Sequence, residues 1–362
     1  MIRILHAADL HMDSPFEGLS SQQAALRRRE QRGLLNRLLE LVEESGAQMM
    51  LLAGDLLDSS DVYAETGAML VNVLGRMSIP VFIAPGNHDF YSLRSPYSRL
   101  QLPENVHVFT ENRLQSVVLE ELGVRVWGAG YTDRVCPPLL DGFSPAREPE
   151  MLEILCFHGE VGSVHSPYAP CTEDDLAVSG VDYAALGHIH RFSGLRRAGD
   201  TYYAWPGCPE GRGFDETGEK GVILADVARG RCRLQFVPLG GRRYEILRVE
   251  AGEDALTSIL AALPEGTERD IYRIILGGEY RGSVDMAALR AVLEERFFAL
   301  QLRDETRPCR ELWDGVDENS LRGLFLRRMH SRLETAESDE ERQKLLIALR
   351  CGLAALQGGE EP

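Results

Sequence analysis

The chain has 362 residues, and single hydrophobic cores tend to stop growing near about 250 to 300 residues, so we expect two domains. With 44% hydrophobic and 26% charged residues, the composition is that of a globular protein and excludes the disordered and fibrous classes. The 39 basic and 56 acidic side chains leave a net charge of -17, which argues against a surface that binds nucleic acid everywhere but allows a local groove.

The N-terminal part of the chain is predicted to alternate strands and helices. Short apolar runs predict strands over residues 2–8, 49–53 and 80–84, and apolar side chains at helical spacing predict helices over 24–44 and 62–77. Ser20 or Ser21 can cap the first helix. Because strands that are joined by helices pair in parallel, the sheet should start out parallel.

Polar side chains follow each of these strands. The three strands end in Asp9-Leu10-His11, Gly54-Asp55 and Gly86-Asn87-His88-Asp89. Two later apolar runs, 152–157 and 183–186, end in His158-Gly159 and Gly187-His188-Ile189-His190. Open α/β sheets bind ligands at the carboxyl ends of their strands, so we expect five strand ends to direct polar groups to one rim.

The rest of the chain predicts a second sheet and a C-terminal region. Short runs over 202–205, 221–227 and 233–237 predict a second sheet packed on the first, and Gly240-Gly241 is the predicted end of a domain over 1–241. Alternating strands and helices over 242–316 predict a small α+β domain, and two terminal helices, 319–333 and 340–356, lie within the segment 317–362. The predicted fold class is therefore α/β, with two sheets flanked by helices, a small α+β domain and terminal helices.

Seven of the polar residues at the strand ends form a ligand set of oxygen and nitrogen atoms without sulfur: Asp9, His11, Asp55, Asn87, His158, His188 and His190. The set is too large for one tetrahedral zinc ion but sufficient for two octahedral ions, and Mn²⁺ or Fe²⁺ suits imidazole and carboxylate ligands. A carboxylate can bridge two such ions, and Asp55, from the middle strand, is the predicted bridge. A single histidine beside a strand is more often structural, so the prediction depends on the combination.

The order of these motifs, D-x-H, G-D, G-N-H-D, H and G-H-x-H, resembles that of the calcineurin-like metallophosphoesterases. Residues 7–16, 54–58, 187–190, 205–207 and 214–221 resemble more narrowly the DNA repair exonuclease branch of that family, with its SbcD-like and YhaO-like nuclease subunits. The resemblance is specific over about residues 1–227 and weak beyond. It implies the two-sheet metallophosphoesterase sandwich and two divalent metal ions, with Mn²⁺ as the first expectation and Fe²⁺ or Mg²⁺ as alternatives.

The resemblance also implies a role for each motif residue. One ion would lie among Asp9, His11, Asp55 and His190, and the other among Asp55, Asn87, His158 and His188. His88 would face the scissile phosphate as transition-state stabiliser or as proton donor to the leaving oxygen, and Asp89 would orient His88 and raise its pKa. Alternatively, Asp89 is a turn residue that binds its own backbone. Asp58 stands where archaeal and eukaryotic relatives carry a histidine, so the contacts of that histidine cannot be transferred.

We expect a two-metal phosphodiesterase that acts as a DNA exonuclease or endonuclease in DNA repair or processing. Its expected partners are DNA and an SbcC-like coiled-coil ATPase, which the two terminal helices would bind, and a homodimer is left open. The same ligands would serve a small-molecule or nucleotide phosphoesterase equally well, and a non-catalytic scaffold is the third alternative. Arg27, Arg28, Arg29 and Arg32 are predicted to form a solvated helix face rather than a contact to the DNA backbone.

The cysteines and the apolar runs bear on the compartment. The seven cysteines are odd in number and include no C-x-x-C pair, which favours reduced thiols and argues against a thiolate metal site. No apolar run reaches the roughly 18 residues of a membrane span, and the first residues read as a strand rather than a signal peptide. We therefore expect a cytoplasmic location and no membrane partner.

Overall fold

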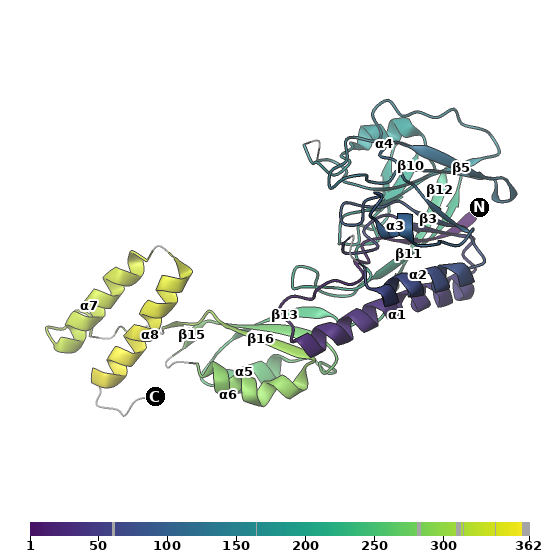
Figure 1. Ribbon diagram of the computed structural model, residues 1–362. Helices are drawn as coiled ribbons and strands as arrows, with labels where there is room; N and C mark the ends of the chain where they lie inside the picture. Colours follow the sequence, from purple (N-terminus) through teal and green to yellow (C-terminus); the bar gives the residue numbers. More distant parts are fainter. Residues whose placement is uncertain are drawn as a thin grey trace. The chain divides into compact units, whose positions relative to one another are not determined.

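The computed structural model describes residues 1–59, 62–163, 165–280, 284–308, 313, 315–336 and 338–356 (Figure 1). The chain divides into two compact units, residues 1–243 and 244–362. Within the described residues, no helix has the length and apolar character needed to cross a membrane. Six cysteines are free thiols, namely Cys136, Cys156, Cys171, Cys208, Cys232 and Cys351, and Cys309 lies outside the described residues.

The first unit contains two six-stranded sheets. The first sheet has the order β12 (Arg231–Pro238), β11 (Gly221–Ala228), β1 (Ile2–Ala7), β2 (Met49–Leu52), β3 (Val81–Ile83) and β4 (Val106–Val108). The second has the order β5 (Gln115–Leu119), β6 (Val124–Gly128), β7 (Leu152–His158), β8 (Tyr183–Gly187), β10 (Thr201–Ala204) and β9 (Arg196–Ala198). The helices are α1 (Ser21–Ser45), α2 (Ala64–Arg76), α3 (Pro96–Arg99) and α4 (Glu173–Ser179), with a 3₁₀ turn at Glu120–Leu122. The predicted two-sheet α/β fold class is confirmed.

The membership of the sheets differs from the prediction in one respect. Strands β1 to β4 pair in parallel as expected, but β11 and β12 do not belong to the second sheet: β11 pairs antiparallel with β1, with Ile2 opposite Val227. The second sheet begins instead with β5 and β6, which the sequence did not predict. An alternating apolar pattern indicates a strand but not its neighbour, because the partner of β11 lies more than two hundred residues away along the chain.

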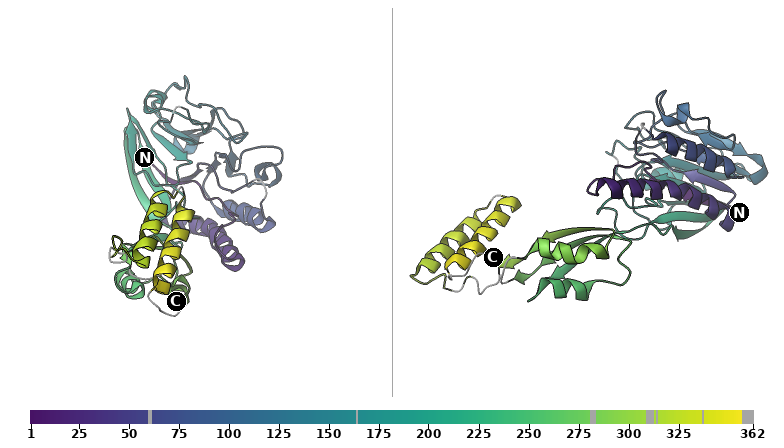
Figure 2. Two further views of the ribbon diagram at one scale, coloured as in Figure 1. Left: turned by 90° about the vertical axis from the view of Figure 1, so that its left-hand side faces the viewer. Right: turned by 60° about the horizontal axis from the view of Figure 1, so that its bottom comes forward.

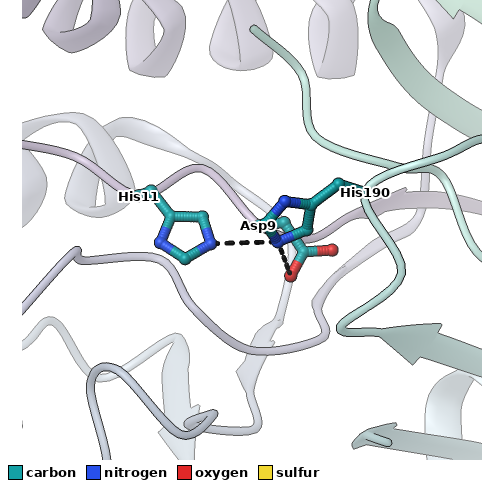
Figure 3. A group of neighbouring side chains, drawn as sticks. All are labelled: Asp9, His11 and His190. Atoms are coloured by element: carbon teal, nitrogen blue, oxygen red, sulfur yellow. Dashed lines mark hydrogen bonds and ion pairs between the residues drawn. The ribbon is translucent and has the colours of Figure 1, made fainter. Parts of the chain in front are cut away.

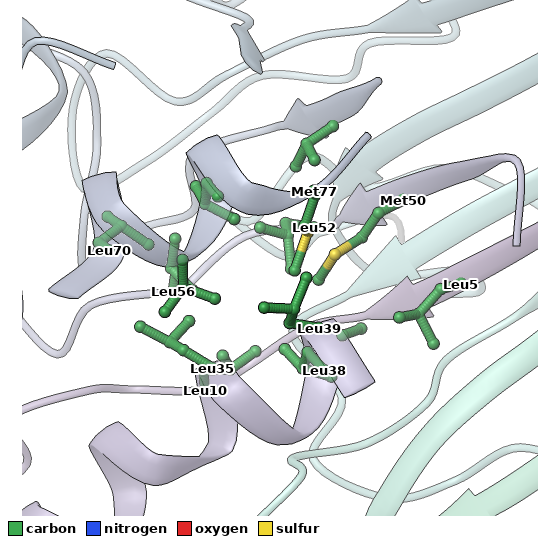
Figure 4. Packing of buried hydrophobic residues seen from close by; sticks show 14 of the residues in the cluster. Leu5, Leu10, Leu35, Leu38, Leu39, Met50, Leu52, Leu56, Leu70 and Met77 are labelled. Carbon is green, nitrogen blue, oxygen red and sulfur yellow. The ribbon is translucent and has the colours of Figure 1, made fainter. Parts of the chain in front are cut away.

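Three apolar clusters hold this unit together. Strands of the first sheet alternate their side chains, so that Ile4 and Leu51 face Ile154 and Ala185 of the second sheet, while their neighbours face the helices. The helix side of the first sheet is packed by residues such as Leu5 and Met50 of the sheet, Leu35 and Leu38 of α1, and Leu70 of α2 (Figure 4). A third cluster covers the outer side of the second sheet. The strands are thus buried on both faces, which fixes where their carboxyl ends lie.

Helix α1 begins with a capping box and carries a buried arginine. Ser20 accepts a hydrogen bond from the Gln23 backbone N–H, and the Gln23 side chain accepts one from the Ser20 backbone N–H. Arg27 is fully buried, forms ion pairs with Glu30 and Glu210 and donates to the carbonyl of Gly211. The prediction of a solvated basic face was therefore wrong for Arg27, because an arginine that is neutralised by carboxylates can be buried.

The second unit contains a three-stranded parallel sheet and a pair of helices. The sheet has the order β13 (Tyr244–Glu250), β14 (Ile271–Gly277) and β16 (Ala299–Asp304), with the helices α5 (Ala255–Ala262) and α6 (Met286–Leu293) and a 3₁₀ turn at Glu294–Arg296. The short strands β15 (Glu279–Tyr280) and β17 (Arg307–Pro308) also pair. Helices α7 (Leu321–Glu334) and α8 (Asp339–Leu356) lie side by side and share an apolar cluster that includes Leu326, Leu349 and Leu353 (Figure 2). Apolar residues at helical spacing predicted both helices.

Candidate metal centre

The carboxyl ends of five strands bring the predicted site residues together. Asp9 and His11 follow β1, Asp55 follows β2, Asn87 and His88 follow β3, His158 ends β7, and His188 and His190 follow β8. Neighbouring loops bond to one another, since the backbone N–H of Asp9 donates to the carbonyl of Gly54 and that of His11 to the carbonyl of Asp55. Both sheets therefore contribute to one site, as parallel strands that end at one edge allow.

The backbone at this site is held in an unusual conformation. Seven described residues other than glycine have positive φ, and four of them are Asp9 (55°), His11 (44°), Asp55 (49°) and His188 (92°). Non-glycine residues rarely adopt this region, and such strain concentrates at functional sites, where the surrounding structure must hold it. The loops also pack too closely for side chains at two glycines: a Cβ on Gly86 would collide with the Asp55 carboxylate, and one on Gly187 with the carbonyl of Ala53.

The donor atoms converge on two neighbouring groups. In the first, Nε2 of His190 lies 3.3 Å from Nε2 of His11 and 3.7 Å from Oδ1 of Asp9 (Figure 3). In the second, Nε2 of His158 lies 3.0 Å from Oδ1 of Asn87 and 3.2 Å from Nδ1 of His188.

A single carboxylate oxygen faces both groups. Oδ2 of Asp55 lies 3.6 Å from Nε2 of His11 in the first group and 3.4 Å from Nε2 of His158 in the second. The other oxygen, Oδ1, accepts a hydrogen bond of 2.9 Å from the backbone N–H of His88. This is the position from which a carboxylate can bridge two cations.

Each of the four histidines bonds outward through its other ring nitrogen. Nδ1 of His11 lies 3.0 Å from the Asp58 carboxylate and Nδ1 of His190 lies 2.6 Å from that of Glu216. Nδ1 of His158 lies 3.1 Å from the Ala53 carbonyl, and Nε2 of His188 lies 2.9 Å from the Glu160 carboxylate. Such acceptors fix the tautomer, so the inward nitrogen of each neutral ring carries a lone pair. Two lone pairs at about 3 Å repel each other, and a shared cation removes that repulsion.

The electrostatics of the site also suit cations. Burial raises the pKa of Asp9 to about 7, and the neighbouring Asp55 carboxylate raises it further. Burial likewise raises the pKa of Asp55, and it lowers the pKa of His158 to about 4. Buried carboxylates beside neutral imidazoles form a pocket that lacks positive charge, which divalent cations supply. The donor set therefore fits Mn²⁺, Fe²⁺ or a similar ion.

His88 and Asp89 lie at the site but do not bond to each other as we expected. Nδ1 of His88 lies 3.1 Å from the carbonyl of Asp58, and the His88 side chain is exposed to a pocket of about 410 Å³. The described hydrogen bonds of the Asp89 carboxylate come instead from the backbone N–H groups of Gly86, Leu56 and Leu57 and from the Tyr97 hydroxyl. Asp89 thus joins the loops after β2 and β3, and the carbonyl of Asp58 orients His88.

Sequence reasoning missed an arginine and two glutamates that surround the ligands. Arg212 donates to Asp58 at 3.0 Å and to Glu216 at 2.8 Å, so that one guanidinium joins the carboxylates behind His11 and His190. These residues follow β10 in a glycine-rich loop, and Glu160 lies two residues beyond His158. The signal that could have found Glu216 is the stretch 214–221, which resembles the exonuclease branch. Arg212 carries no such signal.

Comparisons with known proteins agree with this geometry. A family profile described as calcineurin-like phosphoesterase matches residues 2–192. The chain is 30% identical over 337 residues to the protein of Bacillus subtilis named uncharacterized metallophosphoesterase YhaO, covering 84% of this chain and 82% of the relative. It is 23% identical to the smaller-lettered partner in the name of the Bacillus subtilis nuclease SbcCD, its SbcD chain, covering 97% of this chain and 98% of the relative. It is 24% identical to the DNA double-strand break repair protein Mre11 of Saccharolobus solfataricus, covering 77% and 76%. The resemblance drawn from the motifs is confirmed: the chain belongs to the calcineurin-like phosphoesterases and is a metal-dependent hydrolase.

Proposed function

We propose that the chain hydrolyses phosphodiester bonds in DNA with two divalent metal ions, of which Mn²⁺ suits the ligands well. One observation carries the proposal: four histidines each bond outward through one nitrogen and turn the other toward Asp55. Asp9, His11, His190 and Asp55 would hold one ion, and Asn87, His158, His188 and Asp55 the other. A pair of such ions lowers the pKa of water and neutralises charge on a phosphodiester.

The chain's own contribution to the chemistry comes from His88. Its Nδ1 bonds to the carbonyl of Asp58, so Nδ1 carries the proton and Nε2 is directed away from that carbonyl. In this orientation the protonated ring can stabilise charge on the phosphate or donate the Nε2 proton to the leaving oxygen. The backbone N–H of His88 donates to Asp55, which ties the position of the ring to the bridging carboxylate.

The names of the relatives support DNA as the substrate and an ATPase as the partner. The SbcCD and Mre11 relatives are named for nuclease or double-strand break repair functions. We propose an SbcC-like ATPase as partner, bound by the terminal helices within 317–362, because α7 exposes Leu321 (71%) and Leu324 (59%) and α8 exposes Ile347 (58%). The free thiols fit a reducing compartment, and we propose the cytoplasm.

The decisive experiment offers two kinds of substrate to the purified chain. Linear duplex, hairpin and single-stranded DNA are compared with an aryl phosphodiester, each with Mn²⁺, with Mg²⁺ and without metal. We expect metal-dependent cleavage of DNA, and His88→Ala should lower turnover about 10²- to 10⁴-fold while the metal content stays the same. Hydrolysis of the aryl ester without cleavage of any DNA, with the ATPase present, would replace DNA by a small phosphoester as the substrate.

The ligand assignment is tested by metal content. Asn87→Ala and His158→Ala should each lower the amount of bound metal, measured by elemental analysis after dialysis, because each removes an inward donor atom. His330→Ala, whose side chain is exposed in α7, is the matched control and should bind as much metal as the wild type. Unchanged metal content in both site variants would contradict the assignment.

A further inference from the structure

A second pocket, of about 510 Å³, adjoins the metal centre on the side of Glu160 and Ile189. Glu160, which bonds to His188, lies in its wall, and Ile189 stands between His188 and His190. The remaining lining residues are Val161, Ser163, Arg191, Phe192, Ser193, Arg196 and Trp205. None of them belongs to the proposed ligand set, and the pocket thus begins where that set ends.

The position of the pocket relative to the centre is fixed by Trp205. Its indole N–H donates to the carbonyls of Gly159 and Gly187, at 3.2 and 3.1 Å. These two residues directly follow and precede the candidate ligands His158 and His188. Because the indole is buried and bonded to both strand ends, the pocket is built into the same frame as the metal centre.

The walls of the pocket combine aromatic surface with positive charge. Phe192 is 36% exposed, and its ring stacks on that of Phe236 with centroids 4.6 Å apart. Arg191 is exposed, and within the described part of the chain its guanidinium has no carboxylate partner. The guanidinium of Arg196 lies 5.9 Å from the centre of the Trp205 ring. The one acidic side chain in the wall, Glu160, is bonded to His188.

This charge is unusual for the molecule. The chain carries a net charge of -17, so two arginines in a pocket next to the site cannot be explained by a generally basic surface. Aromatic faces stack on bases, and arginines bind phosphates, so the two together suit a nucleotide. A carboxylate or a neutral sugar would use only part of these groups.

The pocket of about 410 Å³ beside His88 lies at the same centre. It is lined by residues that include Phe90, Arg134 and Tyr168, and the Tyr168 ring lies 4.6 Å from that of His188. His188 is thus contacted by a wall residue of each pocket: Tyr168 from the pocket beside His88, and Glu160 from the pocket beside Ile189. A phosphodiester held at the metal centre therefore has an aromatic and cationic pocket available to each of its two ester groups.

We propose that the pocket of Arg191, Phe192, Arg196 and Trp205 binds the nucleotide that neighbours the scissile phosphate on the side away from His88, with its base against Phe192 and its next phosphate on Arg191. The proposal rests on the proposed function and extends it: the substrate is a nucleic-acid strand that continues beyond both sides of the scissile bond. A small phosphodiester would occupy the centre without reaching the pocket.

The test compares two substrates in the full-length, Mn²⁺-loaded chain. For Arg191→Ala and Phe192→Ala we expect the ratio of kcat/KM for a single-stranded oligonucleotide to kcat/KM for an aryl phosphodiester to fall about tenfold, because a phosphate or stacking contact is lost. Arg197→Ala is the matched control, since Arg197 is exposed and paired with Asp200 at 2.9 Å outside the pocket. Its ratio should equal that of the wild type. Arg191→Ala should also weaken the dependence of oligonucleotide KM on salt.

A purely structural role for these residues would lower both activities together and leave the ratio unchanged, and that result would overturn the proposal. Binding of a labelled oligonucleotide to His88→Ala separates the two levels of the argument. If the wild type cleaves no oligonucleotide but His88→Ala binds one, and added Arg191→Ala weakens that binding about tenfold, the pocket stands and the nuclease function falls. If Arg191→Ala leaves the binding unchanged, the pocket assignment falls.

Discussion

The carboxylate of Glu216 lies 2.6 Å from Nδ1 of His190, and Arg212 bonds to the same carboxylate. Hydrogen bonds from His190 and Arg212 hold the pKa of Glu216 below its usual value, although burial alone would raise it. The carboxylate is therefore ionised, and it fixes the proton of His190 on Nδ1. The inward Nε2 is left free to bind a cation.

Glu216→Gln should weaken metal binding about 10- to 100-fold, because an amide holds the imidazole tautomer less firmly than a carboxylate. The measurement is a titration of metal-free protein with Mn²⁺. Asp215→Asn, at the exposed neighbouring position, removes the same charge and should leave the affinity within about twofold. Equal weakening in both variants would mean that general charge, not the contact to His190, matters.

Asp89 gives a second prediction, in which stability and catalysis separate. Its carboxylate accepts hydrogen bonds from three backbone N–H groups and from Tyr97, so Asp89→Ala leaves several buried donors without an acceptor. We expect the free energy of unfolding in urea to fall by about 3 to 5 kcal/mol. Tyr97→Phe removes one of these bonds and should cost about 1 to 2 kcal/mol. A variant that unfolds like the wild type yet loses turnover would restore the idea that Asp89 acts through His88.

A third prediction concerns His6, which joins the two sheets. Its Nδ1 lies 2.9 Å from the Tyr183 hydroxyl and its Nε2 lies 3.2 Å from the Leu186 carbonyl. Burial lowers the pKa of His6 from 6.5 to about 3, against the hydrogen bond to Leu186, which raises it. The unfolded chain then takes up a proton near pH 6.5 that the folded chain refuses. The stability is fully present above that pH and decreases as the pH falls toward 3, by up to about 1.4 kcal/mol per pH unit.

The check is the free energy of unfolding of the wild type and of His6→Gln between pH 7 and pH 5, at one fixed Mn²⁺ concentration. Glutamine keeps a donor and an acceptor but does not titrate, so the wild type should lose about 2 kcal/mol more than the variant over this range. Metal binding contributes equally to both proteins. Parallel curves would show that His6 is protonated in the folded chain.

The terminal helices give a fourth prediction. Deletion of residues 317–362 should leave hydrolysis of the aryl ester intact and abolish co-purification with the proposed ATPase. The double substitution Leu321→Asp and Leu324→Asp keeps the helices and changes only exposed side chains, and we expect the same loss of the partner. Leu93→Asp, at a residue that is 92% exposed in the first unit, is the matched control. Retention of the ATPase by the truncated chain would contradict this assignment.

Local sequence patterns were sufficient to predict the parts of the fold that depend on neighbouring residues. The apolar runs of β1, β2 and β3 and the helical spacing in α1 and α2 predicted these elements, because short connections force a parallel start. The motif glycines marked the strand ends. The grouping of β11 with β1 depends on a pairing between distant segments, which no local pattern encodes.

The site residues divide in the same way. The seven candidate ligands follow predicted strands, so the topology alone brings them together. Arg212 and Glu216 come from a loop without regular structure, and only the packed structure shows that they lie behind His11 and His190. Arg27 was misread because its charge suggested solvent, whereas its partner Glu210 lies far along the chain.

The left-handed backbone at Asp9, His11, Asp55 and His188 has a consequence for engineering. These four residues owe their conformation to the loops around them, so the coordination geometry is inherited with the turns and not with the side chains alone. Transplanting the seven ligands onto another sandwich with ordinary strand-to-helix turns would give the right composition and no working centre. A successful graft would have to carry the segments 7–12, 52–58 and 186–190 as complete pieces of chain.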